Sequence, residues 1–213
     1  MLYGLLVGGC ADIPSEDGGT YVVKPQDTLY SIAWRHGLDY RDVARWNHIG
    51  ADFRIVVGQT LLLHGVPRTG SPAPAVAGAG APRARASASA PVAPASALKW
   101  VWPTDRSTAP QQVPGGGILL PGQLGQEIRA ACAGRVVYVG DGIRGYGNLI
   151  IVKHGENLLS AYAHNRDVQV HESDEVAAGQ IIGHMGEGAP GKPVLYFEIR
   201  RSGKPVDAIP FLP

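Results

Sequence analysis

The 213-residue sequence predicts a small α+β unit of the βααβ type and a larger, nearly all-β domain, joined by a long linker. Helix and strand signals alternate within residues 20–64, and strand patterns punctuated by glycine fill residues 99–213. Residues 65–98 contain almost only Ala, Pro, Ser, Gly, Val and Arg. Such a segment cannot build a core, so it is predicted to be a flexible linker that lets the two flanking units act at separate places.

The composition is that of a globular protein without attraction to polyanions. Hydrophobic residues make up 45% of the chain, charged residues 17%, and the formal net charge is +1. This balance argues against nucleic acid as a partner. The two cysteines, Cys10 and Cys132, lie too far apart in the sequence to suggest a disulfide framework or a metal site of the CxxC type. Cys132, between alanines and beside a strand, is expected to be a small core residue.

Residues 1–19 begin with an apolar run, Met1 to Gly9, that ends in small residues before Cys10. This segment resembles a lipobox, in which a bacterial lipoprotein is cleaved before the cysteine and its sulfur then carries lipid. The alternative is a frayed apolar terminus, because no basic residues precede the run. No stretch approaches the roughly 20 apolar residues of a membrane-spanning helix, so the only expected membrane attachment is a lipid on Cys10.

The βααβ unit is predicted from caps and periodicity. Thr28 is expected to cap the first helix, Gly37 to end it, and Asp39 to cap the second. The expected order is strand 21–24, helix 29–36, helix 40–46 and strand 56–63.

The unit resembles the LysM family in three sequence segments: Tyr21-Val-Val-Lys-Pro-Gln-Asp-Thr-Leu-Tyr-Ser-Ile-Ala, Trp46-Asn47 and Val57-Gly-Gln-Thr-Leu61. The resemblance implies binding of glycans that contain N-acetylglucosamine. The implied groove lies between the loop Asp27-Thr28-Leu29 and the turn after Asn47. Leu29 and Ile49 are expected to cover the apolar face of a sugar, while polar groups pair with its hydroxyls. Alternatively, Thr28 only caps a helix and Asn47 only ends one.

Residues 99–213 predict an antiparallel β-sheet domain. Its expected strands are 135–139, 149–153, 158–164, 181–184 and 194–200. The domain resembles the LytM, or lysostaphin-type, metallopeptidases. The sequence segments that carry the resemblance are Trp102-Pro-Thr, Gly134-Arg-Val-Val-Tyr, Gly145-Tyr-Gly-Asn-Leu-Ile-Ile-Val-Lys-His, Tyr162-Ala-His164 and Phe197-Glu-Ile-Arg200.

Active members of that family bind zinc through a His, an Asp four residues later and the second His of a His-x-His strand. By resemblance these positions fall on Gly115, Leu119 and Tyr196, and the first His of the His-x-His pair falls on Val194. Only His164 of the implied catalytic set remains. Glycine, leucine and a neutral phenol cannot replace imidazole and carboxylate as zinc ligands, so no metal and no cofactor are expected. A zinc site with unorthodox ligands is the alternative.

Strand alternation predicts which face of strand 194–200 is available to a partner. Leu195, Phe197 and Ile199 are expected in the core. The opposite face is expected to form a metal-free cleft that receives a partner's segment, or else a plain solvent-exposed sheet face. The predicted cleft residues are Val194, Tyr196, Glu198 and Arg200, joined by Ser160, Tyr162 and His164 from a neighbouring strand.

Taken together, the lipobox-like start, LysM, linker and ligandless LytM domain resemble the NlpD-type division lipoproteins of Gram-negative bacteria. The resemblance implies a catalytically inactive, peptidoglycan-binding activator of a periplasmic N-acetylmuramoyl-L-alanine amidase, anchored to the outer membrane and acting when daughter cells separate. Three alternatives stay open: a zinc-dependent endopeptidase, a wall-binding tether that activates nothing, and a regulator of some other enzyme.

Overall fold

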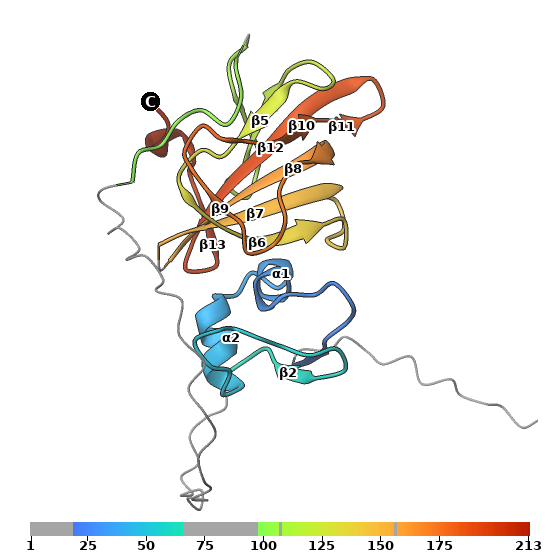
Figure 1. Ribbon diagram of the computed structural model, residues 1–213, viewed down its shortest axis with the longest axis vertical. Helices are drawn as coiled ribbons and strands as arrows, with labels where there is room; N and C mark the ends of the chain where they lie inside the picture. Colours follow the sequence, from blue (N-terminus) through green and yellow to red (C-terminus); the bar gives the residue numbers. More distant parts are fainter. Residues whose placement is uncertain (1–18, 66–97, 107, 156) are drawn as a thin grey trace, which may run out of the picture.

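The computed structural model describes residues 19–65, 98–106, 108–155 and 157–213 (Figure 1). We call residues 19–65 the N-terminal unit and the described part of residues 98–213 the β domain. The expected organisation, a small unit with two helices and a large antiparallel β domain, is confirmed over these residues. The predicted lipid site Cys10 and nearly all of the predicted linker lie outside the described residues.

The N-terminal unit has the predicted order of strand, helix, helix and strand. Its elements are β1 (Thr20–Val22), α1 (Leu29–Arg35), α2 (Tyr40–Trp46) and β2 (Thr60–Leu62). The closing strand is shorter than the predicted 56–63. Val56 instead begins a turn, in which the Gln59 amide donates to the Val56 carbonyl at 3.0 Å and Gly58 takes a left-handed conformation with φ of +86°.

Both helices begin where the sequence predicts, because side chains satisfy their free amide groups. Thr28 and Ser31 form a reciprocal capping box, with the Ser31 amide donating to Thr28 Oγ1 at 3.1 Å. Asp39 caps α2 by accepting from the Arg41 amide at 2.9 Å. Each cap contributes roughly 1 kcal/mol. In the part of the chain that the structure describes, no helix is long and apolar enough to cross a membrane.

The β domain is built from antiparallel strands. They are β3 (Gln111–Gln112), β4 (Ile118–Pro121), β5 (Glu127–Arg129), β6 (Gly134–Gly140), β7 (Asn148–His154), β8 (Leu158–Val168), β9 (Glu175–Val176), β10 (Ile181–Met185), β11 (Glu187–Ala189), β12 (Lys192–Arg201) and β13 (Lys204–Val206), followed by a 3-10 turn, η2 (Ile209–Phe211). The central path runs β3-β4-β12-β8-β7-β6-β9, and the short strands β5, β10, β11 and β13 attach beside it.

One face of this sheet packs on the β domain's own core. Leu195, Phe197 and Ile199 alternate into that core and are fully buried, as predicted. Cys132 is also buried, and burial raises the pKa of its thiol to about 11. The thiol therefore stays protonated, which agrees with the predicted role of a small core residue.

The other face of the sheet carries the N-terminal unit. Figure 1 shows α1 lying next to β6, and a single apolar cluster contains Ile32 and Trp34 of α1 together with Tyr138 and Ile151 of the sheet. The Nζ atom of Lys153 in β7 adds cation–π contacts at 5.3 to 5.9 Å from three aromatic rings of the unit. The two units thus pack against each other in this structure, whereas the linker composition favoured units that act apart.

Candidate functional site

The positions to which the resemblance assigns the family's zinc ligands lie where β4 and β12 pair. Leu119 stands directly opposite Tyr196 in the antiparallel pair, and Gly115 lies in the turn that leads into β4 with φ of +104°. The ring of Tyr196 fills the space over this turn. A Cβ on Gly117 would lie 2.5 Å from the Tyr196 ring, so only glycine leaves room for the phenol there.

Tyr196 takes part in a small polar network. Its hydroxyl donates to Glu198 Oε2 at 2.6 Å, and the Tyr146 hydroxyl donates to the same oxygen at 3.4 Å. Burial, reinforced by the hydrogen bond and the negative charge of Glu198, raises the pKa of Tyr196. The phenol therefore stays neutral and acts as a donor at physiological pH.

His164 lies beside Tyr196, with ring centroids 6.5 Å apart. Its backbone is left-handed, with φ of +63°, and is held by the His164 amide donating to the Tyr146 carbonyl at 2.9 Å. Partial burial lowers the pKa of the imidazole, so the ring is neutral near pH 7. A Cβ on Gly188 would touch both Val194 and the His164 ring, which places these two side chains together at one end of the predicted cleft.

Two predicted cleft residues face the other way. Tyr162 lies opposite Phe197 and Ser160 lies opposite Ile199, and directly opposite residues share a face, so both point into the core, where each is 0% exposed. The prediction for these two residues is wrong. It counted alternate positions back from His164, but the left-handed backbone at His164 shifts the alternation by one residue.

Buried hydrogen bonds explain why polar groups occur on that inner face. The Tyr162 hydroxyl accepts from the Ala131 amide at 2.8 Å and from Ser160 Oγ at 2.9 Å, while His154 Nε2 lies 2.6 Å from Ser160 Oγ. Burial lowers the pKa of His154 to about 4 and raises that of Tyr162, so the network is neutral. This cluster is a structural part of the core.

Glu198 and Arg200 share the face of Tyr196, as predicted, but both are buried: Glu198 is bonded within the β domain, and Arg200 is covered by α1 of the N-terminal unit. Arg200 Nε donates to Glu198 Oε1 at 2.6 Å, and Arg200 Nη1 donates to the carbonyl oxygen of Trp34 at 2.6 Å. The guanidinium carbon lies 3.7 Å from the centre of the Trp34 ring. Glu198 is 1% and Arg200 is 8% exposed. Of the predicted cleft residues on this face, Val194, His164 and Tyr196 are therefore partly exposed, whereas Glu198 and Arg200 are buried.

The predicted glycan-binding residues have structural partners within the N-terminal unit. Asp27 accepts hydrogen bonds from the Tyr21 hydroxyl, the Lys24 amide and Arg35, at 2.7, 2.8 and 3.1 Å. Asn47 ties α2 to β2 by bonding to both backbone groups of Leu62, at 2.7 and 2.8 Å.

One of these predictions needs correction. The side chain of Leu29 is 1% exposed within the core of the N-terminal unit, so it is wrong as a surface for a sugar ring. Ile49 is partly buried and keeps some accessible area. Thr28 serves as the helix cap described above, and its place in the glycan groove stays a prediction.

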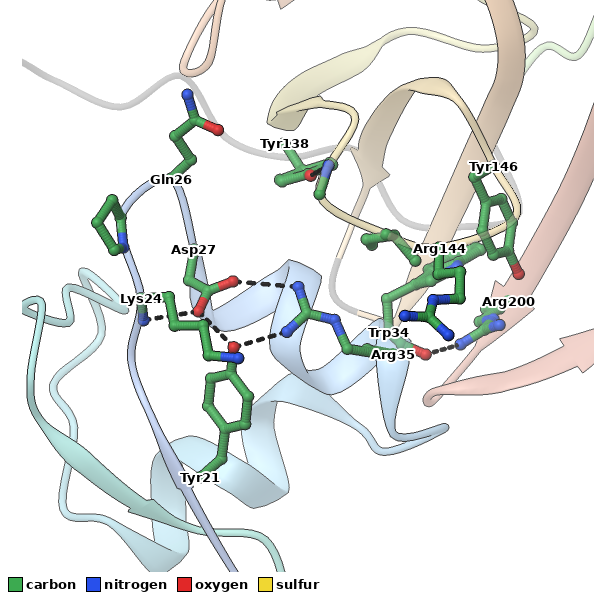
Figure 2. A pocket seen from close by; sticks show the side chains of 13 residues that line it. Tyr21, Lys24, Gln26, Asp27, Trp34, Arg35, Tyr138, Arg144, Tyr146 and Arg200 are labelled. Carbon is green, nitrogen blue, oxygen red and sulfur yellow. Dashed lines mark hydrogen bonds and ion pairs between the residues drawn. The ribbon is translucent and has the colours of Figure 1, made fainter. Parts of the chain in front are cut away.

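A cavity of about 610 Å³ lies between the N-terminal unit and the β domain, and no sequence pattern predicted it. Figure 2 shows side chains of the β1–α1 loop and of α1 on one side and of the β6–β7 loop and β12 on the other. Its lining includes the cationic residues Lys24, Arg35, Arg144 and Arg200 but a single carboxylate, Asp27. Only the packing of the two units brings these residues together, so neither unit's sequence could reveal the site.

The chemistry of the described residues offers no ready metal site. Among residues 19–65, 98–106, 108–155 and 157–213 there is no group of three or more His, Cys, Asp or Glu side chains placed to hold a metal ion. His184, for example, pairs with Asp167 at 2.6 Å.

Both units match known protein families. Residues 21–63 match the LysM domain, and residues 114–208 match peptidase family M23. The β domain also resembles the crystal structure of an M23 peptidase from Pseudomonas aeruginosa, at 25% identity and a TM-score of 0.50, over 55% of this chain and 51% of that one. The fold and the two family matches together place the chain in the class of proteins that join a LysM module to an M23-type β domain.

Several curated relatives match along most of the chain. A lipoprotein NlpD/LppB homolog of Pseudomonas aeruginosa is 43% identical, over 92% of this chain and 77% of that protein. The uncharacterized lipoprotein YgeR of Escherichia coli is 37% identical, over 99% and 89%. The murein hydrolase activator NlpD of Escherichia coli is 37% identical, over 93% and 69%. The chain belongs to the NlpD/LppB family of lipoproteins, which confirms the resemblance drawn from the sequence.

Proposed function

We propose that this protein is a catalytically inactive, peptidoglycan-binding activator of an N-acetylmuramoyl-L-alanine amidase that splits the cell wall between daughter cells. Relatives that carry the name murein hydrolase activator and match more than nine-tenths of the chain support activation. The LysM match supports binding to the wall. The amidase as partner comes from the NlpD-type resemblance of the sequence.

The observation that carries the proposal is the side-chain chemistry at the three positions that the resemblance assigns to the zinc ligands. Gly115 and Leu119 have no coordinating side-chain atom, and the Tyr196 phenol is held neutral and bonded to Glu198. Zinc-dependent hydrolysis requires nitrogen, sulfur or carboxylate ligands that hold the metal and leave a position for water. These residues do not supply such a set, so the β domain serves as a binding module.

The partly exposed side chains of Val194, His164 and Tyr196 form the surface that we propose for the amidase. Val194, His164 and Tyr196 combine apolar area, an imidazole and a phenol on a rigid sheet, which suits a short partner segment. Access to Arg200 on the same face requires α1 to move off β12. Activation is then a population shift, in which the partner selects the undocked form.

A dye-release assay with labelled peptidoglycan tests this proposal. We expect the full chain to release no dye alone and to stimulate a purified amidase of this class. Val194→Ala and Tyr196→Ala should each lower stimulation about tenfold, the effect of losing a contact worth about 1.4 kcal/mol. Val22→Ala is the matched control, because Val22 is an exposed valine of β1, in the other unit. Thermal melts should show that the variants stay folded.

Two outcomes would count against the proposal. Cleavage of peptide crosslinks by the chain alone, with stoichiometric zinc in the protein, would establish an endopeptidase. Unchanged amidase activity in the presence of the folded native chain would leave only a wall-binding tether.

We propose further that the β1–α1 loop, with Asp27 and Thr28, and the turn at Asn47 and Ile49 bind glycan strands of peptidoglycan. The match of residues 21–63 to the LysM domain supports this. Chitotetraose, a neutral N-acetylglucosamine oligomer, should bind the full chain in calorimetric titrations. Gln26→Ala in this loop probes the groove without disturbing the Asp27 network, and an affinity equal to the native one would place the glycan elsewhere.

We propose a periplasmic location with a lipid anchor on Cys10 in the outer membrane. Relatives named as lipoproteins support this, among them outer membrane antigenic lipoprotein B of Haemophilus influenzae, 33% identical over 93% of this chain and 65% of that protein. Cys10→Ser should move the protein from the membrane to the soluble fraction of lysed cells. Equal membrane fractions for both proteins would reject the anchor.

A further inference from the structure

We propose that the cavity between the N-terminal unit and the β domain binds a peptidoglycan fragment through a free carboxylate of its stem peptide. The inference rests on the proposed binding of peptidoglycan and assigns a second, composite site to it. The cavity of about 610 Å³ is within the usual range of roughly 300–1,000 Å³ for small-molecule sites. Its wall comes from both units, so neither unit forms the site alone.

The charges in the wall favour an anion. Asp27 pairs with Arg35 at 3.1 Å, and Glu198 pairs with Arg200 at 2.6 Å, so two of the four cations are already compensated. Lys24 and Arg144 remain, and among the described residues neither has a carboxylate partner within ion-pair distance. Both side chains are exposed, one from each unit, on the border of the same cavity. A carboxylate bound in the cavity can receive a charge-assisted hydrogen bond from either of these two cations.

The rest of the wall suits a sugar-linked peptide. Tyr146 contributes a partly exposed aromatic ring, which can pack against an apolar face of a sugar or peptide, whereas Tyr21, Trp34 and Tyr138 are buried.

The position of Lys24 favours a wall fragment over an unrelated anion. Lys24 lies three residues before Asp27, in the loop to which we assign glycan binding, and its amide donates to the Asp27 carboxylate at 2.8 Å. A glycan held at that loop carries its stem peptide within reach of the cavity. Stem peptides end in free carboxylates, which Lys24 and Arg144 can bind, whereas a neutral chitin oligomer lacks this group.

Calorimetric titration of the full chain tests the site with two probes: the soluble disaccharide tetrapeptide of peptidoglycan and chitotetraose. Lys24→Gln and Arg144→Gln keep the backbone and most of the side-chain volume. We expect each to weaken binding of the disaccharide tetrapeptide about five- to tenfold, and the double variant about 30-fold or more, as for contacts worth about 1 kcal/mol each. Chitotetraose should bind all variants equally. Lys99→Gln, at an exposed lysine outside the cavity lining, is the matched control.

Salt and amidation give a second readout. Raising ionic strength from 0.15 to 0.5 M should weaken binding of the disaccharide tetrapeptide and leave binding of chitotetraose unchanged, because exposed charges are screened. Amidating the carboxylates of the tetrapeptide should reduce its affinity to that of the double variant. Equal native affinities for both probes, or equal losses for both in the variants, would overturn the proposal.

Amidase stimulation, measured in parallel, separates this inference from the proposed function. If the variants lose tetrapeptide affinity and still stimulate the amidase, both proposals hold. If they keep tetrapeptide affinity and lose stimulation, the two cations belong to a protein contact and the carboxylate site is wrong.

Discussion

The substitution Arg200→Ala removes the charged side chain that joins β12 to the N-terminal unit. In the native protein its guanidinium donates to Glu198 and to the Trp34 carbonyl, both at 2.6 Å, and lies against the Trp34 ring. The side chains of Arg200 and Glu198 are 9% and 2% exposed. Alanine would therefore leave a carboxylate in a largely dry environment without its cation.

The expected magnitude follows from these contacts. Breaking a buried ion pair by removing one partner costs about 3–5 kcal/mol. The lower end applies here, because the Tyr196 hydroxyl still donates to Glu198 at 2.6 Å. Loss of the cation–π contact with Trp34 adds about 1 kcal/mol. We expect the free energy of unfolding to fall by about 4 kcal/mol.

Urea unfolding followed by circular dichroism measures this change. Arg201→Ala is the matched control, since Arg201 is the next residue of the strand, is exposed and lies 5.6 Å from the Phe211 ring; its loss should cost less than about 1 kcal/mol. Replacing the pair by apolar residues, Glu198→Leu with Arg200→Met, should recover most of the loss, because no buried charge is left unpaired.

Equal losses for Arg200→Ala and Arg201→Ala would refute the reasoning, since they would mean that the covered position contributes no more than an exposed one. A double replacement as unstable as Arg200→Ala would also refute it. In that case the loss would come from packing and not from an uncompensated charge.

Three further predictions concern stability and reactivity. Gly203→Ala should cost about 1–3 kcal/mol in calorimetric unfolding, because Gly203 has φ of +77° and a Cβ there would overlap the Leu38 carbonyl of the N-terminal unit; a variant as stable as the native protein would argue against the packed arrangement. Burial lowers the pKa of His154 to about 4, so below about pH 6.5 the unfolded chain takes up a proton that the folded chain does not. Stability should therefore fall by about 3 kcal/mol between pH 6.5 and pH 4 in urea titrations, and His154→Gln should flatten this dependence. Burial raises the pKa of the Cys132 thiol to about 11, so in a Cys10→Ser background it should react with a disulfide reagent only after unfolding, and rapid reaction of the native protein would contradict its buried position.

Local patterns were enough to predict the elements and much of the core. The caps Thr28 and Asp39 marked both helix starts, and alternation along β12 identified Leu195, Phe197 and Ile199 as buried. These features depend on neighbours within a few residues. A single chain segment therefore carries the information for them.

The wrong predictions have specific structural causes. The assignment of Ser160 and Tyr162 to the cleft assumed a regular strand, but His164 adopts a left-handed backbone that only the Tyr146 carbonyl and the surrounding loops enforce. Leu29 carries the side chain expected for a sugar contact, yet the first turn of α1 directs it inward. In neither case does the residue type itself signal the deviation.

The contact between the units depends on residues far apart in the sequence. Arg200 and Trp34 are 166 positions apart, and each belongs to a unit whose own pattern is complete without the other. Sequence reasoning could place Arg200 on the outer face of β12. It could not tell that α1 would cover that face, and so it missed the cavity as well.

Because α1 covers Arg200, the N-terminal unit is a tethered competitor for any protein that binds this part of β12. A competitor on the same chain is not lost on dilution, and its effective concentration can reach the millimolar range. The apparent dissociation constant of such a protein is its intrinsic value divided by the fraction of open molecules. A ligand that moves the N-terminal unit away from β12 raises the apparent affinity of β12 for such a protein without adding a contact. A ligand that binds both units at once lowers that affinity.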